Sequence, residues 1–279
     1  MAYVGKGAPL FSLFERQFNE AKISFNSLGK SLKSKKALEL EGKLIFLNIY
    51  LNLLSKVHFK EEKLKFELFG PFKTICKGLK RIHHFKMVSD AFYIEKSRMD
   101  MEYNSYEKYL IAEKKELYKE VYEGLLFSSP DIWEPLYTGA DHYSKEIQPL
   151  MINTATTQLI NEEIEYCGSN GDSHLDSQAI KEILEGLRII IAVENITIAI
   201  GLNPLFTGAI HGEIKELCQV LNKWHQNHLF AQYLSSFLSE KDQAGTKYLE
   251  LVKNIKSNKQ RLTKEVAGHC KYTFAKLLS

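Results

Sequence analysis

Apolar residues recur every three or four positions along almost the whole chain, and this spacing constrains the fold more than any other feature. Between residues 38 and 54 the spacing is kept by five leucines, Leu40, Leu44, Leu47, Leu51 and Leu54. A stripe of this kind covers one face of an α-helix, so it predicts amphipathic helices that pack on a shared core. The 279 residues include only 16 Gly and 6 Pro, too few for a turn-rich β fold. We therefore predict an all-α helical bundle.

Local signals refine this prediction. The β-branched run 189–193 could form a strand, but the helical stripe before it continues into it, so we predict a helix there. Residues 103–126 and about 144–166 are predicted to be further helices, the first of them exposed. The Gly/Asn/Asp/Ser cluster at 168–173 predicts a loop, and Asp176 or Ser177 is a suitable N-cap for the helix that follows.

Composition limits the class of protein. Hydrophobic residues make up 44% of the chain, which is enough for a substantial core, and the formal net charge is only +3. The near balance argues against a protein that coats nucleic acid, although it leaves room for a local basic site. That balance conceals two basic runs. Residues 30–86 hold 14 Lys/Arg against 5 Asp/Glu, and residues 253–276 hold 7 against 1. If the two runs adjoin in the fold, they form one face that attracts anions.

The expected location follows from three observations. The four cysteines are far apart and lack zinc-ligand spacing, so we expect reduced thiols rather than a disulfide framework or a structural zinc. The first residues lack the pattern of a signal peptide. The most apolar stretch, 189–202, is too short to span a bilayer and contains Glu194 and Asn195. We expect a soluble cytoplasmic protein with no membrane partner.

An internal repeat is the strongest long-range signal. Residues 70–83 align with residues 212–225 without a gap, 142 positions later. Five pairs are identical: Gly70/Gly212, Lys73/Lys215, Cys76/Cys218, Leu79/Leu221 and His83/His225. Amphipathic helices share Leu and Ile by chance, but Cys and His are scarce here, so we predict a duplication. The predicted units are residues 8–140 and 141–278, related by an approximate twofold axis within a single domain that covers 1–279.

The repeat directs attention to histidines and cations. Helical spacing places His83 and His225 on the apolar stripes, facing inward, either as hydrogen-bonded core residues or as walls of a cavity shared by the two halves. A fainter correspondence pairs Lys36 and Lys43 with Lys181 and Arg188, each pair being seven residues apart on one helix face.

These residues resemble those of the CHAD domain (conserved histidine α-helical domain) family. The resemblance lies in the segments 79–88 and 217–229, which are similar to the family's leucine- and histidine-containing helix, and in 179–189, which is similar to its helix of spaced Lys/Arg. It covers residues 8–278 through loose patterns. Two departures stand out: the family's leading histidine is missing from both halves, and His84 and Gln226 occupy the positions where acidic partners would follow.

The resemblance implies a bundle of two pseudo-symmetric repeats that binds inorganic polyphosphate or a related polyanion, without catalysis and without a metal or other cofactor. Lys and Arg on rigid helices suit such a ligand because they form charge-assisted hydrogen bonds with phosphates. The candidate polyanion-binding residues are Lys73, Lys80, Arg81, His83, Lys181, Arg188, Lys215, Lys223 and His225. The alternative is a protein-interaction scaffold that has lost the anion site, with the helix around 103–122 as its contact surface.

Other functions have less support. The chain contains no GxSxG, P-loop, HExxH or GxGxxG pattern, and it lacks the Glu-x-x-His pairs of di-iron bundles. His83–His84 and His225/His228 could hold a metal, but no carboxylate pattern accompanies them. The aromatic residues in the basic runs have helical spacing, which is typical of core residues rather than of a nucleic-acid surface.

Overall fold

The structure is a computed structural model that describes residues 9–30, 32–59, 61, 63–171, 175–241 and 245–277. These residues form helices and no β-strand, which confirms the predicted all-α class. The helices are α1 (Pro9–Leu28), α2 (Ser34–Val57), α3 (Leu64–Phe69), α4 (Lys73–Met99), α5 (Asn104–Leu126), α6 (Trp133–Ser144), α7 (Pro149–Gly171), α8 (Ser177–Ala199), α9 (Gly208–Ser239) and α10 (Thr246–Leu277). Two short 3₁₀ turns, Gly70–Phe72 and Pro130–Ile132, precede α4 and α6.

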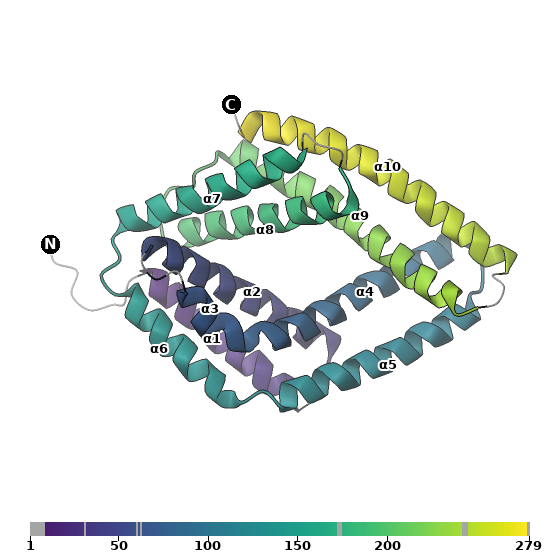
Figure 1. The fold of residues 1–279 in the computed structure, drawn as a ribbon, viewed down its shortest axis with the longest axis horizontal. Coiled ribbons are helices and arrows are strands. Elements are labelled where there is room, and N and C mark those ends of the chain that lie inside the picture. The colour runs from purple at the N-terminus through teal and green to yellow at the C-terminus, as the bar shows by residue number, and fades with distance from the viewer. Residues whose placement is uncertain are drawn as a thin grey trace.

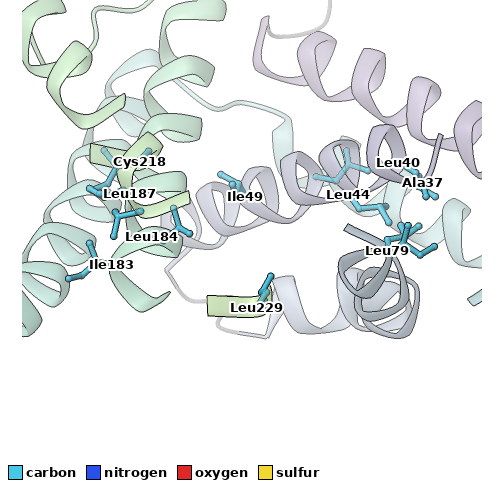
Figure 2. Close-up of a cluster of buried hydrophobic side chains, with 14 of the residues drawn as sticks. Ala37, Leu40, Leu44, Ile49, Leu79, Ile183, Leu184, Leu187, Cys218 and Leu229 are labelled. Atoms are coloured by element: carbon cyan, nitrogen blue, oxygen red, sulfur yellow. The ribbon is translucent and has the colours of Figure 1, made fainter. Parts of the chain in front are cut away.

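Four helices, α2, α4, α8 and α9, provide the centre of the bundle. The pairs α2–α4, α8–α9, α4–α9 and α2–α8 are in contact, and each central helix also packs against an outer neighbour: α1, α5, α7 and α10 respectively. Figure 1 shows α7 beside α8 and α10 along α9, with the N-terminal helices on the opposite side. The close-up in Figure 2 draws buried side chains from these four helices, among them Leu40, Leu79, Leu187 and Leu229.

The helical stripes read from the sequence are the ones that the core buries. All five leucines of the α2 stripe are buried. Phe72 at the end of the first 3₁₀ turn is buried too, as are Ile75, Leu79 and Ile82 at the start of α4. The run 189–193 lies inside α8, which confirms a helix rather than a strand. Asp176 is the N-cap of α8, since its carboxylate accepts hydrogen bonds from the backbone N–H groups of Gln178 and Ala179, both at 2.8 Å.

Two boundaries differ from the prediction. Ser144 ends α6 instead of opening the next helix, because Lys145 is extended and Glu146 is left-handed (φ 63°) before α7 begins at Pro149. Proline suits that first position, where no backbone donor is needed. The loop predicted at 168–173 is wrong for residues 168–171, which belong to α7; residues 172 and 173 lie outside the described part.

The duplication stays a prediction. The junction that it places between residues 140 and 141 falls inside α6. Among the described residues, no helix combines the length and apolar character needed to cross a membrane.

Candidate anion-binding site

The structure brings three of the nine predicted site residues to one cavity. Lys80 of α4, Lys181 of α8 and His225 of α9 line a space of about 500 Å³ that α7 closes on another side. The cavity reaches the size range of small-molecule sites. Its wall is mixed in charge, because Glu163, Glu182 and Glu185 also line it.

Glu185 occupies the middle of a charge network on the cavity wall. Its Oε1 lies 3.0 Å from Lys80 Nζ and 3.6 Å from Arg188 Nη1. Arg188 also donates through Nη2 to Asn222 Oδ1 at 2.6 Å. Of the predicted cations in this region, Lys80 and Arg188 are thus partly neutralised before any ligand arrives.

Two imidazoles meet where α4 crosses α9. His84 Nε2 lies 3.5 Å from His225 Nε2, and the rings are edge to face. Burial and the neighbouring imidazole lower the pKa of His225 to about 3. Burial and the nearby Lys80 lower the pKa of His84 to about 4. Both rings are therefore neutral at pH 7.

A lysine–histidine cluster, defined here as Lys181, His225, His228 and Lys259, joins α8, α9 and α10. Burial, Lys259 and Lys181 lower the pKa of His228 to about 4. Burial and Lys181 also lower the pKa of Lys259, whose Nζ lies 3.3 Å from Ser177 Oγ and over the Trp224 ring. Lys181 thus lies close enough to His225, His228 and Lys259 to disfavour positive charge on each of them.

Several polar groups of this cluster are unpaired. Lys181 forms no hydrogen bond or ion pair with any residue that the structure describes, and Lys259 has no carboxylate partner there. His225 and His228 are only 8% and 7% exposed. Nδ1 of His225 and both ring nitrogens of His228 lack a hydrogen-bond partner in the described structure. Buried polar atoms are normally satisfied, so the cluster is suited to receive a hydrogen-bonding anion.

His83 does not line this cavity, so the structure does not bring the two repeat histidines to one shared wall. His225 is buried as predicted, but the His83 side chain is 36% exposed, and its Nδ1 lies 2.7 Å from Glu41 Oε2 on α2. The next residue, His84, meets His225 instead. Consecutive residues of a helix point about 100° apart, and α4 lies between α2 and α9, so the two histidines reach different neighbours.

The remaining predicted residues are dispersed. Arg81 Nη1 pairs with Glu120 Oε1 of α5 at 2.5 Å, and Lys73 lies over the Phe66 ring at 4.5 Å. Lys215 is exposed on α9. Lys223, also exposed, lines a separate groove with Arg261. The nine candidates therefore do not form one surface.

The two basic runs lie on different helices, and α9 packs between the helices that carry them. Residues 30–86 reach from the end of α1 into α4, residues 253–276 belong to α10, and α9 packs against both α4 and α10. Carboxylates also neutralise part of the first run: Lys36 pairs with Glu39, Lys43 with Glu20, Lys56 with Glu162, and Lys86 with Asp90. The excess of Lys and Arg counted in residues 30–86 is thus larger than the positive charge that this run leaves unpaired in the structure.

The site residues that sequence reasoning missed are Lys259, Glu163 and, as binding residues, His84 and His228. His228 follows His225 by three positions, which places both on one side of α9, and this spacing was a usable signal. Nothing local to Lys259 or Glu163 distinguishes them from other charged helix residues. The described residues contain no group of three or more His, Cys, Asp or Glu side chains arranged to hold a metal ion.

Comparison with known proteins adds no identification. No family model, no curated protein sequence and no solved structure matches this chain.

Proposed function

We propose that this protein is a non-catalytic helical module that binds inorganic polyphosphate or a related polyanion, with the lysine–histidine cluster as its anchor. One observation carries the proposal: Lys181 and Lys259, from different helices and without carboxylate partners in the described structure, flank two buried imidazoles with unpartnered nitrogens. A phosphate group placed there would accept hydrogen bonds from both lysines and from the imidazole N–H groups. Such bonds are charge-assisted and therefore stronger than neutral ones.

The resemblance to the CHAD family supports the same ligand class and a two-repeat architecture. The order of helix contacts agrees with a duplication, since α1–α2–α4–α5 and α7–α8–α9–α10 are each chains of packed neighbours. In this proposal α3 and α6 are additions to the first repeat. We also propose a cytoplasmic location, which the four free cysteines support because thiols stay reduced there.

The test is a titration of fluorescently labelled long-chain polyphosphate with the full chain at low and at moderate salt. Lys181→Gln and Lys259→Gln are each expected to weaken binding by about tenfold, which corresponds to about 1.4 kcal/mol. Higher salt should weaken binding of the wild type, because phosphate contacts are screened.

Lys253→Gln is the matched control, because it removes the same charge from an exposed position on α10 outside the cluster. Arg81→Gln and Lys223→Gln extend the comparison to predicted residues that lie away from the cluster. Absence of binding at low salt, or equal losses in all five variants, would contradict the proposal.

A protein-binding scaffold is the second candidate function. The groove between α4 and α5 favours it, because Tyr93 and Ile111 line that groove and are 51% and 67% exposed. Exposed apolar side chains that gather in one groove are typical of protein contacts. A partner captured by the wild type but not by Ile111→Asp, with polyphosphate binding unchanged, would support this function.

A further inference from the structure

The cavity beside the lysine–histidine cluster holds unpaired groups of both signs. Lys181 is the unpaired cation. On the α7 side, Glu163 forms no hydrogen bond or ion pair within the described part of the chain. Burial raises its pKa, and Lys65 of α3 lies near enough to oppose that shift without pairing with the carboxylate. The two side chains line the same cavity but do not pair with each other. A molecule bound between them could satisfy both.

The position of Glu163 is defined by the close approach of α7 to α8. A Cβ atom added to Gly186 of α8 would lie 3.0 Å from Glu163 Oε2, so the carboxylate lies directly against α8 at the cavity wall. Gly186 also lines the cavity. The absence of a side chain at this position therefore leaves room for the carboxylate at the wall.

The charge pattern restricts the shape of the ligand. A long phosphate chain running through the cavity would face Glu163, Glu182 and Glu185, and like charges at short range oppose binding. A single phosphate group at the Lys181 end avoids this repulsion. Hydroxyl or ammonium groups at the other end would donate to the glutamates, while Leu184, Ile189 and Leu229 contact the body of the molecule.

We infer that the cavity binds a small phosphomonoester whose body carries hydroxyl or ammonium groups, with its phosphate at Lys181 and its donors at Glu163. This inference rests on Lys181 as the anion-binding residue of the proposed function and assigns a second, smaller class of phosphate ligand to the cavity beside the cluster. The two ends of the cavity then select the ligand. Lys181 favours a phosphate group, and Glu163 favours a molecule with several hydrogen-bond donors. The cavity volume of about 500 Å³ accommodates a molecule of hexose phosphate size.

The test is isothermal titration calorimetry of the full chain with glucosamine 6-phosphate, glucose 6-phosphate and phosphoethanolamine. Inorganic phosphate and glucosamine are titrated as controls, because each carries only one of the two parts of glucosamine 6-phosphate. At least one phosphomonoester is expected to bind with 1:1 stoichiometry and about tenfold more tightly than inorganic phosphate, because it also satisfies the acidic end. Glucosamine alone is expected to bind weakly.

Two variants separate the ends of the cavity. Lys181→Gln should weaken both the phosphomonoester and inorganic phosphate, whereas Glu163→Gln should weaken only the phosphomonoester. Lys253→Gln and Glu165→Gln, which remove the same charges from exposed positions on α10 and α7, should change neither. Thermal unfolding of each variant checks that the fold is retained.

The outcomes separate this inference from the proposed function. If none of the three phosphomonoesters binds more tightly than inorganic phosphate, or if Lys181→Gln leaves their binding unchanged, the inference is wrong. Polyphosphate binding that depends on Lys181 would in that case leave the proposed function standing. Phosphomonoester binding without polyphosphate binding would reject the polymer as ligand and keep the small-molecule site.

Discussion

His225 Nε2 lies 3.5 Å from His84 Nε2, and this contact joins α4 to α9 at the cavity. Neither ring is ion-paired with a carboxylate in the described structure; Glu41 and Glu185 lie near His84 and oppose the lowering of its pKa, but burial and Lys80 outweigh them. The pair is therefore a neutral polar contact within a largely apolar interface, and protonation of either ring would place a charge beside Lys80, Arg188 or Lys181.

The free energy of unfolding is expected to decrease as the pH is lowered, because of this pair. The pKa values of His84 and His225, about 4 and about 3, lie below the usual 6.5, so the unfolded chain binds more protons than the folded one below pH 6.5. The stability present above that pH is lost as the pH falls toward the folded values. His225→Gln should reduce the slope of unfolding free energy against pH by about 1 kcal/mol per pH unit in this window. Urea unfolding from pH 7 to pH 4.5 measures it, and parallel profiles for wild type and variant would contradict the assignment.

Gly186→Ala should destabilise the contact between α7 and α8. The added Cβ would lie 2.6 Å from the buried Cys167 Sγ, closer than packed atoms tolerate. We expect a loss of about 1–3 kcal/mol in unfolding free energy. Gly268→Ala on α10 is the control, because no atom lies within 4 Å of the added Cβ. Alanine stabilises a helix by about 1 kcal/mol relative to glycine, so this variant should be slightly more stable than the wild type. Equal effects of the two substitutions in urea unfolding would show that packing at Gly186 is looser than the structure indicates.

Glu194 is expected to anchor the connection between α8 and α9. Its carboxylate is fully buried and accepts hydrogen bonds from the backbone N–H of Leu205 at 2.8 Å and of Phe206 at 3.4 Å. Glu194→Ala should lower the unfolding free energy by about 2–3 kcal/mol, because two backbone donors lose their acceptor. Glu194→Gln keeps one acceptor oxygen and should cost less. A loss of the same size in both variants would mean that the negative charge, and not the hydrogen bonds, is what stabilises the loop.

The thiols should be slow to react in the folded protein. Burial raises the pKa of Cys167 and Cys270 to about 12 and that of Cys218 to about 11, which suppresses the reactive thiolate. With Ellman's reagent at pH 8, the native chain should react far more slowly than the urea-unfolded chain, which should release four equivalents. Burial also raises the pKa of Cys76 to about 12, but its side chain is partly exposed whereas the other three are buried, so Cys76 should react first and Cys76→Ser should remove the first phase. Rapid reaction of a second thiol in the native protein would contradict the burial of Cys167, Cys218 and Cys270.

The helical class and the buried stripes were predictable from the sequence, because both follow from spacing within one helix. Leu40, Leu44 and Leu47 recur at helical intervals, and a bundle of this size must bury such a stripe against some partner. The N-cap at Asp176 was also predictable, since a capping carboxylate acts on residues two and three positions away. The start of α7 was misplaced because a few residues with extended and left-handed backbone around Glu146 leave little trace in the spacing of apolar residues.

The site was decided by the tertiary structure. Helix spacing placed His83 and His225 on apolar stripes, but only the packed bundle shows that His83 reaches Glu41 of α2 and that His84, one position later, reaches His225 of α9. Whether a lysine is neutralised depends on carboxylates far along the chain, as Lys80 pairs with Glu185 across 105 positions while Lys181 has no such partner among the described residues. Local periodicity determines which face of a helix is apolar, because that depends only on backbone geometry. Pairing across helices depends on crossing angles and on side-chain reach, which only the packed bundle sets.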